Sequence, residues 1–491
     1  MQLIRRIQRF GDFLKNYIRF SFSILKMENS DQKKSREVFL DNESDNYGIG
    51  YDDRMRANKK RSREPPHLLK IKESVPKLNK RLKTEIHTSM ENLINQTDYY
   101  IENRLRKVYP YAFTYCAYVK RRWVGKTVSK LFSKEFSAQT VETINDRISK
   151  GYLKVNGETI DGDYILRDND LISHRIHRHE FPVLAAPIPI IYCDDNILVI
   201  DKPPSIPVHP CGKFRLNTIL SLLERENNLD NLHVIHRLDR LTSGVMIFGR
   251  SRDHAQRFHE QIRERKVQKE YVCRVEGFFP DGLIECDQPI ETLEHRIRVC
   301  LISSEGKPSR TIFQRLNFNG KSSTVLCQPI TGRMHQIRVH LQYLGHPILN
   351  DKFYNNTIFG KQKGKFGEFG RSRDEILNDL ERSHMRSNYY FKNGDQTSDE
   401  IDPNRDAKNE IAMKALLHYT SDRDWNNLHD KYRFHSEKIL HEDDCDECRN
   451  KSIDPDIHEQ LIYLHAFRYK GENWSFETQL PIWAHETWTY D

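Results

Sequence analysis

Two apolar runs joined by a short, highly charged turn limit the fold of this chain more than any other feature. The turn reads HRLDRLTSG and occupies residues 236–244, with LHVI before it and VMIFGRS after it. Apolar runs of this length around a polar turn are typical of neighbouring β-strands. Asp239 stands between Arg237 and Arg240, which leaves two interpretations: a surface hairpin with a salt bridge, or a carboxylate positioned in a basic groove.

Length and composition bound the number of domains and the environment. The 491 residues leave room for two or three domains of roughly 150 residues each. The formal net charge of +8 permits a nucleic-acid partner without requiring one. The nine cysteines are scattered, which argues against a disulfide framework and fits a reducing compartment. No apolar run approaches the roughly 20 residues of a membrane span, so we expect no membrane association.

The first 85 residues predict targeting and linker segments. Residues 1–26 are amphipathic, rich in arginine and poor in acids, which is typical of a mitochondrial presequence. An ordinary amphipathic helix docked on the fold is an equal alternative. Residues 27–85 are polar and predict a disordered linker, within which KKRSR (59–63) leaves a nuclear location open. Met27 provides a second start, so the expected locations are the cytoplasm, the mitochondrion or both.

Residues 86–123 form a basic, aromatic stretch, which we interpret as an extension of an RNA surface. Residues 124–180 predict two short amphipathic helices, the second capped by Ser137, followed by strands. Helix, helix and then G-x-x-x-V-N-G (151–157) resembles the α-L RNA-binding module of certain ribosomal proteins and tRNA synthetases. Backbone phosphates would attract the cations on one side of this unit. The cations that we predict to bind RNA there are Lys126, Lys130, Arg147 and Lys150.

Four motifs then follow in one order: HRLDRLTSG, KEYVCRVEG (269–277), TGRMHQIRVHLQYLGHPI (331–348) and LHAFRY (464–469). They resemble the motifs of the RluA-type pseudouridine synthases. The resemblance implies an α+β fold, with a mixed, mainly antiparallel sheet in a catalytic domain over residues 181–491, preceded by the helix–helix–strand module. It implies an enzyme that isomerises uridine to pseudouridine in RNA, without a metal or another cofactor.

The resemblance is strongest to the eukaryotic branch that modifies tRNA, including position 32 of the anticodon loop. Met334 and LND (349–351) depart from the common pattern, and both are interpreted as peripheral to the motif. We therefore expect RNA as the partner, tRNA in particular, and a monomeric enzyme without a small-molecule cofactor. Two alternatives stay open: a pseudouridine synthase that acts on messenger or ribosomal RNA, and a catalytically silent RNA-binding protein on the same fold.

The resemblance also assigns site residues. Asp239 matches the family's catalytic aspartate, Tyr271 its active-site tyrosine and Arg338 its basic partner. Arg237 matches the residue that takes the space of the flipped base. Each has a simpler alternative: a turn cap for Asp239, strand packing for Tyr271 and a surface ion pair for Arg338.

Residues of about 360–455 predict a flexible insertion, with short helices near 374–384 and 407–418. HSEKILHEDDCDEC (435–448) contains H-x-E and C-x-x-C, as zinc deaminases do, but seven residues between Glu437 and Cys445 are too few for that fold. An exposed acidic loop is the favoured interpretation, and we predict no metal. The alternative is a small zinc site whose ligands would be His435, His441, Cys445 and Cys448.

Overall fold

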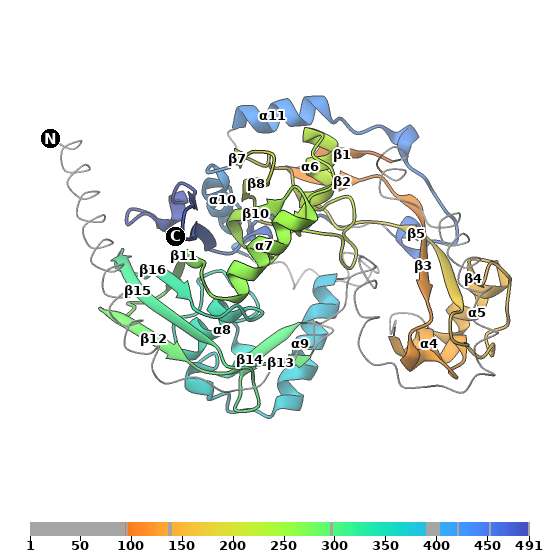
Figure 1. Cartoon of the computed structure of the whole chain (residues 1–491), viewed down its shortest axis with the longest axis horizontal. Coiled ribbons are helices and arrows are strands. Elements are labelled where there is room, and N and C mark those ends of the chain that lie inside the picture. The colour runs from red at the N-terminus through yellow and green to blue at the C-terminus, as the bar shows by residue number, and fades with distance from the viewer. Residues whose placement is uncertain are drawn as a thin grey trace. The chain divides into compact units, whose positions relative to one another are not determined.

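The computed structural model describes residues 94, 97–135, 140–294, 298–388, 403–419, 422–450 and 453–489. All of them belong to one unit of the chain, Gly48–Asp491 (Figure 1). The predicted presequence (1–26) and linker (27–85) lie outside the described residues, so both stay predictions.

A ten-stranded sheet organises the carboxyl-terminal part of the chain. Its order is β12-β15-β16-β11-β17-β10-β8-β7, with β9 beside β10 and β18 beside β17. The strands are β7 Ile190–Cys193, β8 Ile197–Lys202, β9 His233–Val234, β10 Ser243–Gly249, β11 Gln268–Glu276, β12 Leu283–Asp287, β15 Arg310–Phe318, β16 Ser322–Pro329, β17 Leu464–Lys470 and β18 Ser475–Glu477. β10 and β17 pair in parallel, and the other described pairings of this sheet are antiparallel. The predicted α+β fold with a mixed, mainly antiparallel sheet is confirmed.

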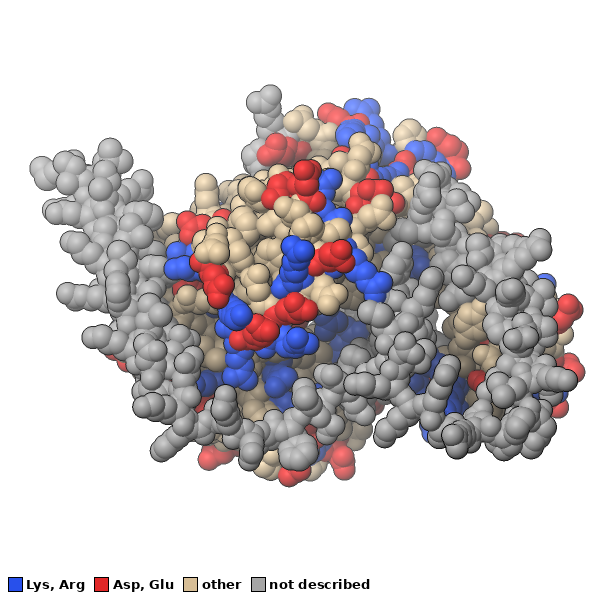
Figure 2. Space-filling view, viewed as in Figure 1, with Lys and Arg blue, Asp and Glu red and all other residues tan. Residues whose placement is uncertain are grey.

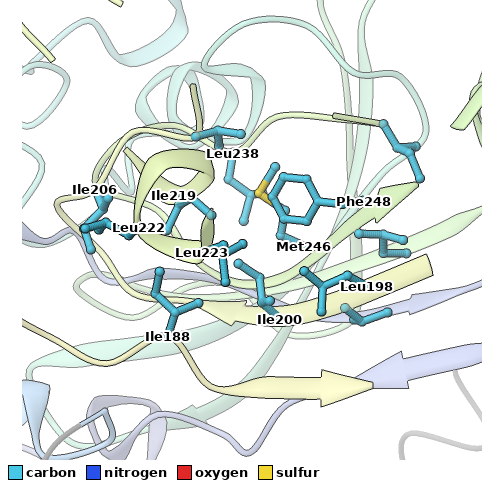
Figure 3. Packing of buried hydrophobic residues seen from close by; sticks show 14 of the residues in the cluster. Ile188, Leu198, Ile200, Ile206, Ile219, Leu222, Leu223, Leu238, Met246 and Phe248 are labelled. Atoms are coloured by element: carbon cyan, nitrogen blue, oxygen red, sulfur yellow. The ribbon is translucent and has the colours of Figure 1, made fainter. Parts of the chain in front are cut away.

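The core lies around β8 and β10, which are buried along their whole length. Continuous apolar runs allow this, because a strand that is covered on both faces needs no polar alternation. The register sets Ile200 opposite Met246 and Leu198 opposite Phe248. Helix α6 (Ile219–Asn227) adds Leu222 to the same cluster, as Figure 3 shows.

The remaining helices of this part surround the sheet or belong to the 360–455 segment. They are α7 Arg252–Arg263, α8 Gln336–Tyr343, α9 Arg373–Asn388, α10 Arg405–Leu416, α11 Asp422–Lys431 and α12 Asp446–Arg449. Short 3-10 helices are η2 Arg121–Trp123, η3 Thr357–Phe359, η4 Lys365–Gly367, η6 Ser436–Lys438, η7 Ile457–Gln460 and η8 Ile482–Ala484. Among the described residues, no helix has the length and apolar character needed to cross a bilayer.

The amino-terminal module has its own small core. Helices α4 (Val128–Glu135) and α5 (Val141–Ser149) lie beside the sheet of β3 (Tyr111–Tyr118), β5 (Leu171–Arg178) and β4 (Leu153–Val155) (Figure 1). The buried face of the two helices includes Leu131, Phe132, Ile144 and Ile148. The two predicted helices are therefore present.

Two details of this module differ from the sequence expectation. The cap of α5 is Thr140, whose side chain accepts a hydrogen bond from the amide of Thr143. Ser137, the predicted cap, lies outside the described residues. Strand β3 falls within the predicted 86–123 extension, yet it pairs with β5 along its whole length. The aromatic stretch thus supplies a strand of the module, because its alternating side chains fit one face of that sheet.

Two smaller sheets complete the described structure. β1 (Tyr99–Glu102), β2 (Leu105–Val108) and β6 (Val183–Leu184) form an antiparallel sheet, and β13 (Ile290–Glu294) pairs with β14 (Val299–Ile302).

The 360–455 segment contains the two predicted helices, as α9 and α10, and also α11. Parts of it pack against the core: Ile376, Leu380 and Leu416 are buried. Residues 389–402 lie outside the described residues.

Candidate active site

The charged motif at 236–244 forms the connection between β9 and β10. The two strands pair with Val234 opposite Phe248 and His233 opposite Gly249. Within the connection, the amide of Thr242 donates to the carbonyl of Asp239 at 3.1 Å. The prediction of a turn between two apolar strands is confirmed, and Asp239 lies in that turn.

A buried lysine fixes the backbone around Asp239. Lys202 is the last residue of β8 and is fully buried. Its Nζ donates to the backbone carbonyls of Pro203 at 2.9 Å, Arg240 at 3.0 Å and Thr242 at 2.9 Å. These bonds use all three N–H groups of an ammonium ion. Moving the turn would leave a buried amino group without hydrogen-bond partners, which is costly, so Lys202 holds the turn in place.

Arg338 lies buried between two carboxylates. Its Nε and Nη2 donate to the two oxygens of Asp351 at 2.6 and 2.8 Å, and its Nη1 donates to Oδ2 of Asp239 at 3.4 Å. The backbone amides of Phe353 and Tyr354 also donate to Asp351. Two-point pairing fixes the plane of a guanidinium group. Asp351 therefore orients the remaining nitrogen of Arg338 toward Asp239.

The surroundings of Asp239 favour its ionised form. Burial raises the pKa of this carboxyl, but His335, when protonated, and Arg338 lower it by more, so that the pKa lies below its usual value. The Nε2 of His335 is 3.7 Å from Oδ2 of Asp239. Burial lowers the pKa of His335 itself to about 4. At neutral pH the imidazole is therefore neutral, and Arg338 is the cation that stabilises the carboxylate.

Two tyrosines from neighbouring strands stand beside this carboxylate. The hydroxyl of Tyr271, on β11, lies 2.5 Å from the hydroxyl of Tyr469, on β17. The register of β11 and β17 shifts between Glu270 and Tyr271, and such a bulge re-aims the side chain that follows it. Burial raises the pKa of Tyr271 to about 12, and the charge of Asp239 contributes to this rise. The phenol is thus neutral at physiological pH.

One cavity of about 760 Å³ is lined by Asp239, His335, Arg338 and the two tyrosines. Its volume lies within the size range of small-molecule sites. The lining holds eight arginine and lysine side chains but a single acid, Asp239. The cations are Arg237, Arg240, Arg263, Arg265, Lys269, Arg298, Arg333 and Arg338. A lone carboxylate among cations fits the second interpretation of the motif, a positioned carboxylate in a basic groove.

The structure brings together four of the predicted site residues and separates the others from them. Asp239, Tyr271, Arg338 and Arg237 line the cavity, and Arg237 is exposed. The four cations predicted to bind RNA, Lys126, Lys130, Arg147 and Lys150, lie on the module and are not part of the cavity lining.

Sequence reasoning missed several groups that hold the site. Asp351 belongs to LND, which was expected to be peripheral but anchors Arg338, and Met334 lines the cavity. Both positions are therefore part of the site, contrary to the prediction. Tyr469 ends LHAFRY, a motif to which the sequence analysis assigned no site residue. Lys202 carried a weak signal, because its charge ends an apolar strand that is buried on both faces.

The histidines of the motifs are hydrogen-bonded within the protein. The Nε2 of His236 accepts from the amide of Ile247 at 3.2 Å. The ring nitrogens of His340 contact Oγ1 of Thr311 at 2.9 Å and the carbonyl of Gln288 at 3.0 Å. The Nδ1 of His335 lies 2.7 Å from the hydroxyl of Tyr354. These contacts hold the three rings in place, and the Nε2 of His335 faces Asp239 at 3.7 Å.

Comparison with known proteins gives consistent similarities. Residues 196–343 match a family model described as RNA pseudouridylate synthase. The chain is 40% identical over 433 residues to pseudouridylate synthase RPUSD2 of Mus musculus, covering 85% of this chain and 78% of the relative. It is 36% identical over 404 residues to the mitochondrial tRNA pseudouridine(32) synthase of Saccharomyces cerevisiae, with 78% of each chain covered. It is 30% identical over 438 residues to the tRNA pseudouridine(31) synthase of the same yeast, covering 80% and 98%.

Removing Asp351 should destabilise the protein far more than removing an exposed carboxylate of similar geometry. Asp351→Ala takes away the main partner of buried Arg338, a loss expected to lower the free energy of unfolding by about 3–5 kcal/mol. Glu285 pairs with Arg310 through two bonds of 2.6 and 3.1 Å but near the surface, so Glu285→Ala should lower it by at most about 1 kcal/mol. Urea unfolding followed by tryptophan fluorescence measures both, and equal decreases would contradict the assignment.

Proposed function

The chain belongs to the RluA-type RNA pseudouridylate synthase family and isomerises uridine to pseudouridine in RNA; from this premise we propose which residues carry the reaction and which RNA they act on. The reaction breaks the bond between uracil N1 and ribose C1′, turns the base and joins its C5 to C1′. A proton leaves C5 and N1 gains one, so the product has the same formula as the substrate. The chain acts as a monomer and needs no cofactor for this chemistry.

Asp239 is the reacting carboxylate. The observation that supports this role is its setting: a single acid in a basic cavity, kept ionised by Arg338. An ionised carboxylate is the form that acts as a nucleophile. The other cations of the lining fit the phosphates on either side of the target uridine.

Tyr271 supplies the aromatic ring that stacks on the uracil. Its hydroxyl, held by Tyr469 at 2.5 Å, is assigned a proton transfer at ribose C2′, from which a proton leaves and to which it returns, so the overall balance is unchanged. Arg237, exposed at the cavity, takes the space that the base leaves in the RNA. Base flipping costs a few kcal/mol, and a cation that fills the gap offsets part of that cost.

We expect Asp239→Asn to abolish isomerisation while RNA binding is retained. The side chain keeps its size but loses its anionic oxygen, so the rate on bound RNA should fall by roughly 10⁴-fold or more, as when a reacting side chain is removed. Tritium release from 5-tritiated uridine in the natural RNA measures the rate, and filter binding measures the affinity.

The matched control is Asp195→Asn, which alters an exposed aspartate that is not part of the cavity lining. It should react like the unaltered enzyme. Substantial pseudouridine formation by the Asp239→Asn enzyme would reject the assigned role.

The amino-terminal module is the second RNA-binding surface of the proposal. At the centre of the face in Figure 2, outside the module, basic and acidic side chains are interspersed. The four cations on the module differ in setting. Lys130 is exposed, Arg147 is half-buried, and Lys150 pairs with Asp146 and Asp444 at 2.9 Å.

The double variant Lys126→Gln/Lys130→Gln should weaken RNA binding and flatten its salt dependence. Removing one lysine–phosphate interaction reduces the magnitude of the slope of log affinity against log salt by about 0.7–0.9, so removing two reduces it by about 1.5. Lys408→Gln/Lys414→Gln on α10 is the control of equal charge change. Binding isotherms at several salt concentrations provide the comparison. Equal slopes for the two variants would mean that the module binds something other than RNA.

The substrate of the proposal is a uridine in the anticodon loop of tRNA, at or near position 32. Two similar yeast proteins are named as tRNA pseudouridine(32) and tRNA pseudouridine(31) synthases, one of them mitochondrial. Loop bases are partly unstacked and therefore easier to flip. We extend the proposal to two pools, a mitochondrial one translated from Met1 and a cytoplasmic one from Met27.

Mapping pseudouridine in tRNA from a deletion strain tests this choice. Strains that carry only the Met1 form or only the Met27 form, each tagged at the carboxyl end, should restore anticodon-loop pseudouridine in mitochondrial and in cytoplasmic tRNA respectively. If anticodon-loop pseudouridines persist in the deletion while sites in messenger or ribosomal RNA vanish, the substrate assignment is wrong. If the Met1 form never enters mitochondria, the presequence assignment is wrong.

A further inference from the structure

Two histidines and two cysteines converge at a place that is not part of the cavity lining described above. His177 is in β5 and His179 follows that strand, while Cys445 precedes α12 and Cys448 lies within it. One ligand atom of each side chain, nitrogen or sulfur, lies within 4.8 Å of all the others. The two pairs come from segments more than 260 residues apart, so folding has brought them together.

The separations of the four atoms fit a tetrahedral ion. The Cys445 sulfur is 3.5 Å from Nε2 of His179, and the Cys448 sulfur is 3.4 Å from Nε2 of His179 and from Nδ1 of His177. A tetrahedral zinc ion with Zn–S of about 2.3 Å and Zn–N of about 2.1 Å sets sulfur–nitrogen edges of roughly 3.6 Å. A thiol that hydrogen-bonds to one imidazole explains one such contact. It does not explain four ligand atoms around one point.

Local backbone structure brings the two histidines close to each other, and likewise the two cysteines. Residues two apart on a strand face the same side, which places both imidazoles of the His177–Arg178–His179 stretch on one side of β5. Their rings lie 4.9 Å apart at an angle of 83°, so the two rings stand edge to face. The C-x-x-C stretch opens the short helix α12, where the amides of Glu447 and Cys448 donate toward the Cys445 sulfur.

Ion pairs hold the two segments against each other on either side of the cluster. Glu442 pairs with Arg175 at 2.6 Å, and Asp444 with Lys150 at 2.9 Å. Glu447 pairs with Lys213. The acidic stretch is largely exposed, as the sequence predicted, and three of its carboxylates also pair with basic side chains. The cysteines within it are carried to the two histidines by contacts that do not depend on a metal.

The two other groups of histidine and acid side chains in the described structure have polar partners outside the group: Asp456 pairs with Arg405, and His458 contacts Asn409. In the group of Asp201, His418 and His465, Asp201 accepts from Tyr419 and His465 contacts Ser243. The local candidates from the sequence are also paired differently. His435 contacts Glu437 at 3.1 Å and His441 contacts Asp443 at 3.4 Å.

We propose that His177, His179, Cys445 and Cys448 bind one zinc ion, which fastens the 360–455 segment to the amino-terminal module. Two thiolates and two imidazoles form a closed structural set, with no position left for a water or substrate. The site is thus separate from the isomerisation chemistry. The ligand set also corrects the alternative from the sequence, in which His435 and His441 supplied the nitrogens.

Metal analysis of the full-length protein tests the proposal directly. The protein is purified without chelator, saturated with zinc chloride, desalted and measured by mass spectrometry for metal. The unaltered chain should retain a single zinc ion, and Cys448→Ser or His179→Ala should weaken binding by more than about 100-fold, beyond the effect of losing an outer-shell partner. Cys193→Ser, at an exposed free thiol, and His441→Ala should leave zinc content unchanged.

Cobalt substitution supplies a readout independent of activity and of folding yield. Cobalt in the full chain should give the intense visible bands of tetrahedral coordination and a thiolate-to-cobalt charge-transfer band in the near ultraviolet. Cys445→Ser should weaken the charge-transfer band. If the unaltered chain keeps no more zinc than Cys445→Ser/Cys448→Ser, the site does not exist. Loss of zinc in His441→Ala would overturn this ligand set.

Discussion

The row of half-buried Asp239 and buried Arg338 and Asp351 is the interaction on which the site depends. Asp351 holds Arg338 through two bonds of 2.6 and 2.8 Å, whereas Asp239 receives one long contact of 3.4 Å. This inequality has a chemical consequence. The guanidinium charge keeps Asp239 ionised, but its strongest bonds go to the other carboxylate. Asp239 thus keeps its charge while one of its oxygens has no bond to Arg338, which suits the role of reacting carboxylate that we propose for it.

The same motif also serves the sheet. Gly244 adopts φ of +111°, and a Cβ there would lie 2.2 Å from the carbonyl oxygen of Ala466. Strand β17, from the end of the chain, passes this close because it pairs in parallel with β10. It also pairs with β11, which sets Tyr469 beside Tyr271. Residues of HRLDRLTSG before β10 therefore line the cavity. Gly244, at the end of the motif, allows β17 to pair in the centre of the sheet.

Much of this could be predicted where the signal is local. Turn residues between apolar runs predicted the β9–β10 connection, and ordered motifs predicted the sheet and the residues Asp239, Tyr271 and Arg338. What could not be predicted depends on contacts across the fold. Nothing near Lys202 indicates that its ammonium group binds carbonyls 38 and 40 residues away. The role of Asp351 was equally hard to predict, because a single acid after a turn has many ordinary roles.

The Cys445 and Cys448 pair illustrates the limit in another way. A search near the pair finds His435 and His441, whereas the structure offers His179, 266 residues from Cys445. The acidic residues around the pair were interpreted as solvated because runs of like charge usually are. Here two of them pair with basic side chains of the module: Glu442 with Arg175, and Asp444 with Lys150. For the proposed RNA surface, this means that a phosphate at Lys150 must compete with a carboxylate already in place. Lys130 is exposed, so the proposal places the stronger phosphate contact on α4 rather than at the end of α5.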